Sequence, residues 1–90
     1  MVQYDLSIVG RVQGVGFRYY ALQRAKELGI TGWVKNTVDG NVEVVAQGDE
    51  PTLKTYVDYL HLGPTLSRVD KITTYKSEVI KVFDNFSVKY

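Results

Sequence analysis

The residue patterns of this chain predict an α+β fold in which an antiparallel sheet carries two helices on one of its faces. Alternating apolar and polar residues indicate strands at the beginning, the middle and the end of the chain. Two other segments repeat their apolar residues at helical spacing, and Asp39-Gly40 indicates a tight hairpin. The resulting order β-α-β-β-α-β is that of the split βαβ, or ferredoxin-like, architecture.

A glycine-rich loop joins the first expected strand to the first expected helix. Apolar and polar residues alternate over residues 2–8, as in a half-buried strand. The helix has one apolar face, formed by Phe17, Ala21, Ala25 and Leu28. Gly29 predicts its end, since glycine readily adopts the left-handed conformation that closes a helix. No Ser, Thr, Asp or Asn precedes the helix as a cap, which is expected where a bound anion serves as the cap.

Residues 31–35 and 42–47 predict the two strands of the hairpin. The break that follows contains a proline and starts a second helix, for which Asp49 or Glu50 is the expected cap. The apolar stripe of this helix consists of Leu53, Val57 and Leu60. Gly63-Pro64 is expected to end it.

The last quarter of the chain carries weaker signals. Val69 and Ile72 belong to a fourth strand, and their spacing of three residues predicts a β-bulge between them. Residues 77–85 show no clear pattern. A last, shorter strand is predicted by the alternating residues Phe86, Val88 and Tyr90.

Length and composition limit the range of possible functions. The chain has 90 residues, enough for a single domain over residues 1–90 with one core. Its 11 basic and 10 acidic side chains give a net charge of +1, without the basic excess typical of nucleic-acid binders. It has no cysteine, and no apolar run indicates secretion or a membrane span. We therefore expect a cytoplasmic monomer that binds neither nucleic acid nor membrane.

The loop from Gly10 to Arg18 carries the clearest functional signal. Glycine allows the backbone to curl until successive N–H groups point at one spot, and a helix N-terminus adds further donors. Arg18, one turn into the helix, adds a charged fork that suits two oxygens of a phosphoryl group. The run lacks the Gly-Lys of a P-loop, and Tyr19 stands where a dinucleotide fingerprint needs its third glycine. These residues predict a small cradle for one phosphoryl group.

Other residues have plainer interpretations. Asn36 lies shortly before the hairpin turn, and its residue type alone favours turn chemistry. His61, the only histidine, is expected at a helix end, where it favourably meets the helix dipole. Tyr19 and Tyr20 are expected in packing or rim positions. No group of His, Cys and acidic residues has metal-ligand spacing, so we expect no metal and no cofactor.

Two segments resemble the signatures of the acylphosphatases. Residues 12–18 (VQGVGFR) look like the first, residues 32–42 (GWVKNTVDGNV) with Gly48 beyond are similar to the second, and the likeness extends to residues 86–90. The resemblance implies a ferredoxin-like fold and the metal-free hydrolysis of acyl phosphates to carboxylate and inorganic phosphate. Lys89 departs from the pattern, because many members of the family carry arginine there.

The resemblance also assigns roles to residues. It implies that Arg18 and Asn36 are catalytic, and that Asn36 holds the attacking water rather than shaping the turn. The phosphoryl group would be bound by the loop, namely by Gln13, Gly14, Val15, Gly16, Phe17 and Arg18. Within that loop we expect Phe17 to pack in the core and Gln13 to shape the backbone.

Two other classes of function stay open at this point. A ferredoxin-like module that binds RNA would display aromatic side chains on a central strand, and residues 41–47 contain none. A regulatory domain could bind phosphate or carbamoyl phosphate without turnover. Hydrolysis fits the scarcity of acid–base groups, because a carboxylate leaves without being protonated and phosphoryl transfer depends mainly on positioning and charge.

Overall fold

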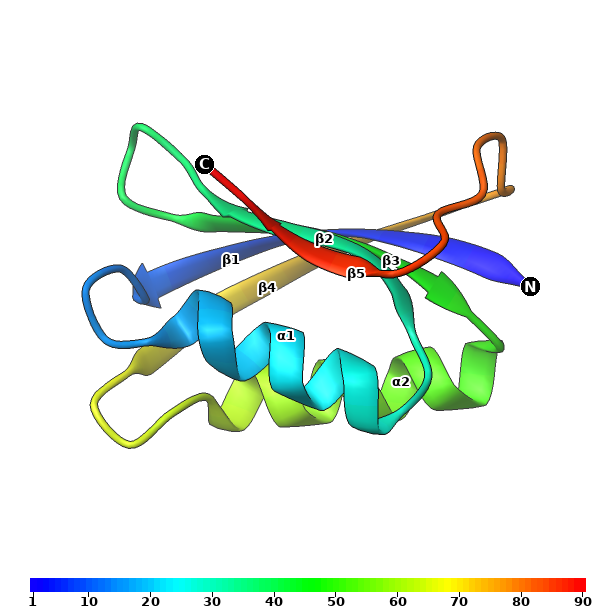
Figure 1. Ribbon diagram of the computed structural model, residues 1–90. Coiled ribbons are helices and arrows are strands. Elements are labelled where there is room, and N and C mark those ends of the chain that lie inside the picture. The colour runs from blue at the N-terminus through cyan, green and yellow to red at the C-terminus, as the bar shows by residue number, and fades with distance from the viewer.

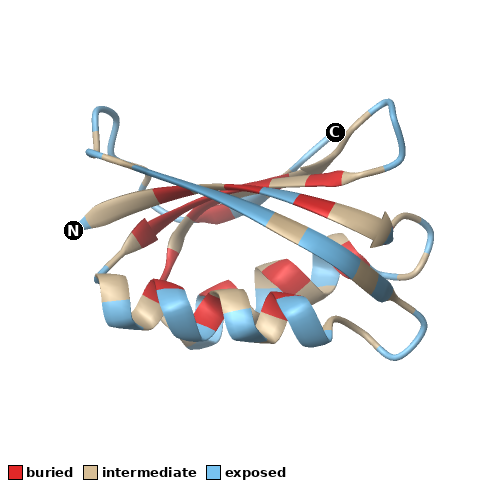
Figure 2. Ribbon diagram, turned by 180° about the vertical axis from the view of Figure 1, so that it is seen from behind, coloured by how far each residue is buried: buried red, intermediate tan, exposed pale blue.

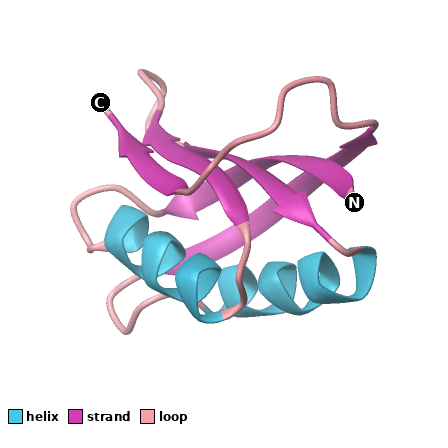
Figure 3. Ribbon diagram, turned by 45° about the vertical axis from the view of Figure 1, so that its right-hand side comes forward, coloured by secondary structure: helices cyan, strands magenta, loops and turns pink.

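The computed structural model describes residues 1–90 and contains two helices and five strands in two layers (Figure 1). Both helices cover the same face of the sheet (Figure 3). The elements are β1 (Val2–Arg11), α1 (Phe17–Glu27), β2 (Thr31–Asn36), β3 (Val42–Gly48), α2 (Glu50–Leu62), β4 (Arg68–Ser77) and β5 (Phe86–Lys89). The predicted element order is therefore confirmed. Neither helix is long and apolar enough to cross a membrane.

The five strands form one sheet in the order β4-β1-β3-β2-β5. The first four strands pair antiparallel, as predicted. The fifth, β5, pairs parallel with β2, so the sheet is mixed. This parallel edge arises because the segment after β4 crosses the end of the sheet and carries the chain from one edge to the other (Figure 1).

The irregular spacing in β4 reflects a bulge. Val9 on β1 pairs with Lys71, whereas the next residue, Gly10, pairs with Val69, so that Asp70 has no partner. The extra residue explains why Val69 and Ile72 are three positions apart in a strand, and the predicted bulge is confirmed.

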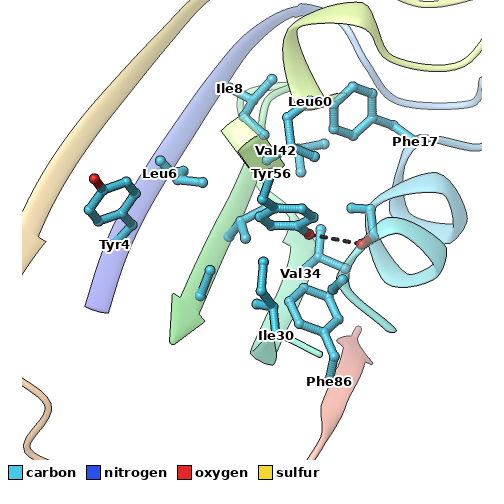
Figure 4. Packing of buried hydrophobic residues seen from close by; sticks show 14 of the residues in the cluster. Tyr4, Leu6, Ile8, Phe17, Ile30, Val34, Val42, Tyr56, Leu60 and Phe86 are labelled. Atoms are coloured by element: carbon cyan, nitrogen blue, oxygen red, sulfur yellow. Dashed lines mark hydrogen bonds between the residues drawn. The ribbon is translucent and has the colours of Figure 1, made fainter. Parts of the chain in front are cut away.

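The core lies between the sheet and the inner faces of the helices (Figure 2). On α1 the buried residues are the predicted Phe17, Ala21 and Ala25. On α2 the prediction was partly wrong, because Tyr56 is fully buried while Val57 is only partly so. A tyrosine tolerates this position because its hydroxyl donates a hydrogen bond of 2.8 Å to the carbonyl oxygen of Ala21 (Figure 4).

The start of α2 also differs from expectation. Asp49 occupies the N-cap position, but no side chain makes a capping hydrogen bond. Glu50 instead accepts hydrogen bonds from the Tyr4 hydroxyl, at 2.7 Å, and from the Lys76 ammonium, at 2.8 Å. The carboxylate thus ties the start of α2 to β1 and β4. The Lys76 bond and, after it, the Tyr4 bond hold the pKa of Glu50 below its usual value.

Candidate active site

The β1–α1 loop, the β2–β3 hairpin and the C-terminal end of the chain lie at the same end of the molecule (Figure 1). In the loop, Gly14 and Gly16 have φ values of 72° and 80°, in the left-handed region that favours glycine. A Cβ atom at either position would meet no atom within 4 Å, so it is the backbone conformation that calls for glycine there. Gly16 is the N-cap of α1, and no side chain caps the helix. The N–H donors of its first turn therefore remain open to a ligand.

Gln13 connects this loop to the hairpin. Its side-chain Nε2 donates to the carbonyl oxygen of Thr37, at 2.8 Å, and to that of Asn41, at 2.7 Å. These are the two residues that close the hairpin, through a 2.9 Å bond from the Thr37 amide to the Asn41 oxygen. Gln13 thus fixes the loop relative to the end of β2, where Asn36 lies.

Asn36 is the last residue of β2 and pairs with Val42. Its side-chain oxygen Oδ1 is buried and has no hydrogen-bond partner in the protein. Leaving such an oxygen unpaired costs about 1–3 kcal/mol, and groups of this kind are retained mainly where they serve a function. Asn36 is also one of the residues that line the pocket described below, so this oxygen is an unpartnered polar atom beside that pocket.

Arg18 lies in the first turn of α1 and is half-buried. Its guanidinium forms no ion pair with a carboxylate. Instead, its central carbon lies 5.0 Å from the centroid of the Tyr90 ring. A half-buried cation without a carboxylate partner, at a helix N-terminus, is arranged to receive an anion.

These features meet in one pocket of about 320 Å³. Of the residues that the sequence singled out, Gly14, Gly16, Phe17, Arg18 and Asn36 line it. Gln13 and Val15 do not. Gln13 acts from behind the loop through its two hydrogen bonds, and Val15 packs against the core. Phe17 adds little accessible surface to the pocket, because it is only 1% exposed.

Sequence reasoning missed four apolar residues of this pocket, namely Val12, Leu22, Val88 and Tyr90. Leu22 follows Arg18 by four residues, which places both on one face of α1, and this spacing could have identified it. Val88 lies on β5 and Tyr90 directly follows that strand, and their distance from Arg18 in sequence hides their place in the same pocket. Tyr19 lines the rim and is 64% exposed, in agreement with a rim position.

Other candidate residues lie away from the pocket. The Lys89 ammonium lies 4.4 Å from the centroid of the Trp33 ring, and neither residue lines the pocket. His61 is exposed in the last turn of α2, as predicted. No group of three or more His, Cys, Asp or Glu side chains is placed to hold a metal ion. Arg18 is the one charged side chain in the lining of the pocket.

An open helix N-terminus, a cation and a buried amide thus lie together on a ferredoxin-like fold, in an arrangement suited to an anion. The acylphosphatase family model matches residues 4–88. An acylphosphatase of Bacillus velezensis is 41% identical over 90 residues, and the match covers 100% of both chains. The crystal structure of acylphosphatase from Bacillus subtilis, 40% identical, has a TM-score of 0.98 and covers 100% of both chains. That of an acylphosphatase from Coxiella burnetii, 33% identical, has a TM-score of 0.91 over 97% of this chain and 90% of that chain.

The chain belongs to the acylphosphatase family. The family predicted from the two signatures is confirmed, and with it the ferredoxin-like fold and the class of hydrolase.

Proposed function

We propose that this protein hydrolyses acyl phosphates to a carboxylate and inorganic phosphate, by in-line attack of a water held by Asn36 on a phosphoryl group bound by residues 13–18. The observation that carries the proposal is the unpaired, buried Oδ1 of Asn36, which lines the same pocket as Arg18 and the glycine loop. Family membership supplies the reaction class, and the pocket supplies groups suited to it.

Charge stabilisation falls to Arg18 and to the start of α1. The guanidinium has no carboxylate to release before it binds a phosphoryl group, so its two-pronged contact is available at little cost. The uncapped N–H groups that follow Gly16 add donors toward the equatorial oxygens. Because phosphoryl transfer depends mainly on such contacts, these two features account for much of the expected rate.

Asn36 has the complementary task of orienting water. An amide oxygen accepts a hydrogen bond from water but is too weak a base to remove its proton, so the residue positions the nucleophile. The phosphoryl oxygens themselves accept the proton in this scheme. On the other side of the phosphorus, a carboxylate leaves without protonation, since its conjugate acid has a pKa of about 4 to 5.

Substitution of Arg18 tests whether its charge stabilises the phosphoryl group during the reaction. We expect Arg18→Ala to lower kcat/KM for acetyl phosphate by about 10²–10³-fold, and Arg18→Lys to restore little of it because a point charge lacks the planar fork. Arg24→Ala, which removes an arginine from the same helix but outside the pocket, is the matched control and should retain activity. Equal activity of the Arg18 and Arg24 variants would contradict the proposal.

Substitution of Asn36 tests whether this residue positions the attacking water. Asn36→Ala should lower kcat by about 10²-fold while inhibition by inorganic phosphate stays nearly unchanged, because the phosphoryl contacts remain. Asn85→Ala, in the exposed segment before β5, serves as the control. Loss of phosphate affinity with normal kcat would overturn the assigned role. Phosphate binding without hydrolysis of any acyl phosphate would indicate a binding domain instead of an enzyme.

A further inference from the structure

The pocket has two chemically different parts. The glycine loop, Arg18 and Asn36 are polar and are matched to a phosphoryl group and a water molecule. Beyond them the lining includes the side chains of Tyr19, Leu22 and Val88, none of which carries a charge. A substrate that places its phosphoryl group in the polar part has only its acyl group left to contact this second part.

The positions of these residues follow from the fold. Leu22 lies one helical turn beyond Arg18 on the same face of α1. Val88 pairs with Val34 on β2, a fully buried residue, so both point toward the helices. Leu22 and Val88 are partly buried and pack against the core. They therefore give the pocket an apolar lining from α1 and from β5.

The direction of the reaction favours the α1 wall as the acyl contact. Asn36 belongs to β2, so in the proposed mechanism the water that it holds approaches the phosphorus from the side of the pocket that the sheet builds. In-line displacement places the leaving oxygen on the opposite side, which α1 builds with Tyr19 and Leu22. The Tyr19 hydroxyl accepts a 3.0 Å hydrogen bond from Nε2 of Gln23, one turn along the helix, which holds the ring at the rim.

We propose that Leu22, with Tyr19 and Val88, makes this enzyme selective for acyl phosphates whose acyl group is small, apolar and uncharged. The inference rests on the proposed function and adds the class of acyl group. The volume of about 320 Å³ lies at the low end for ligand pockets, roughly 300–1,000 Å³, which limits the chain to a few carbons. Arg18, the one charged side chain of the lining, is occupied by the phosphoryl group, so a second negative charge on the acyl group finds no partner.

Acetyl, butyryl and hexanoyl phosphate provide the test, because their leaving carboxylates have similar basicity and differ only in apolar length. We expect kcat/KM to rise about twofold per methylene from acetyl to butyryl phosphate, roughly half of the effect of complete burial, and to rise no further at hexanoyl phosphate, because the pocket of about 320 Å³ limits the chain to a few carbons. Succinyl phosphate, similar in length to butyryl phosphate but with a second carboxylate, should be a poorer substrate than butyryl phosphate.

Variants assign the selectivity to residues. Leu22→Ala should flatten the dependence on chain length, and Leu22→Lys should reverse the preference of butyryl over succinyl phosphate by offering a cation. Leu22 also packs against the core, so the ratio between substrates is measured within each variant, where a loss of folded protein cancels. Tyr19→Ala, at a 64% exposed position, should flatten the dependence without affecting the core. Leu62→Ala, exposed at the end of α2, is the matched control.

The outcomes separate the two proposals. Hydrolysis of all these substrates at equal rates, or a dependence on chain length that Leu22→Ala and Tyr19→Ala leave intact, would overturn the acyl selectivity and leave the proposed function standing. Failure to hydrolyse any of them would overturn both. A dependence on chain length that both variants flatten and that Leu62→Ala retains would support the assignment.

Discussion

Replacement of Gln13 by glutamate should break the link between the glycine loop and the β2–β3 hairpin, with almost no change in side-chain shape. In the protein, Nε2 of Gln13 donates to the carbonyl oxygens of Thr37 and Asn41, at 2.8 and 2.7 Å. A carboxylate has no hydrogen to donate at neutral pH, so Gln13→Glu replaces two attractive contacts by two that are repulsive. The glycine loop would then separate from the hairpin that begins after Asn36.

The magnitude follows from those two bonds. A typical neutral hydrogen bond contributes about 0.5–1.5 kcal/mol net, so their loss lowers the free energy of unfolding by about 1–3 kcal/mol, and the repulsion adds to this. Domains are commonly stable by about 5–15 kcal/mol, so the variant should still fold. Its activity should fall further than its stability suggests, by about tenfold or more in kcat, because small displacements of positioned groups strongly slow the reaction.

Denaturant unfolding and steady-state kinetics with acetyl phosphate measure the two effects separately. Gln3→Glu is the control at the opposite end of the molecule, because Gln3 donates one side-chain hydrogen bond, to Asp5, that glutamate would lose, while the bond that it accepts from Gln47 can remain. That variant should lose stability and keep its kcat. If Gln13→Glu loses stability but keeps full kcat, the link between loop and hairpin has no part in catalysis, and the reasoning is wrong.

Three further outcomes are expected. Tyr56→Phe removes the buried bond to the Ala21 oxygen and should lower the free energy of unfolding by about 1 kcal/mol in a thermal or denaturant melt, with kcat/KM unchanged. The pKa of Glu50 is lowered by Lys76 and Tyr4, so its stabilising effect is full above the ordinary pKa of a glutamate carboxyl and is lost as the pH falls through the lower pKa of the folded state. Glu50→Gln should therefore lower stability at pH 7 and show a weaker loss on acidification, and parallel curves for both proteins would contradict this. Activity should be insensitive to EDTA, because no cluster of metal ligands is present, and inhibition reversed by one particular metal would refute this.

Much of the fold could be predicted because local periodicity reflects burial. The alternation in β1 and the stripe of Phe17, Ala21 and Ala25 match the buried faces observed. The parallel pairing of β5 could not be predicted, since it depends on where the patternless segment 78–85 leads the chain. On α2, Tyr56 was passed over because its hydroxyl looks polar until the Ala21 oxygen is seen beside it.

The features of the site, too, were predictable from the sequence only in part. Arg18 and the two glycines were predictable from a local run, because a turn and a helix start are encoded by adjacent residues. The contact between Arg18 and Tyr90 joins distant parts of the chain and depends on the position of β5. The two carbonyl partners of Gln13 could not be predicted for another reason: every residue has a backbone carbonyl, so the residue type does not show which one accepts a hydrogen bond. The roles of Arg18 and Asn36 stay predictions, as do a cytoplasmic location and a monomeric state.

The composition of the pocket also limits the bonds that the enzyme can break. Its lining offers the guanidinium of Arg18, the amide of Asn36, and the hydroxyls of Tyr19 and Tyr90 on exposed rings at the rim. A leaving alkoxide needs a general acid, and the lining contains no aspartate, glutamate or histidine side chain for that role, whereas a carboxylate departs without one. The proposed mechanism therefore requires the site only to place a phosphoryl group and a water against each other. Such an arrangement suits an acyl phosphate, because its carboxylate is already a good leaving group.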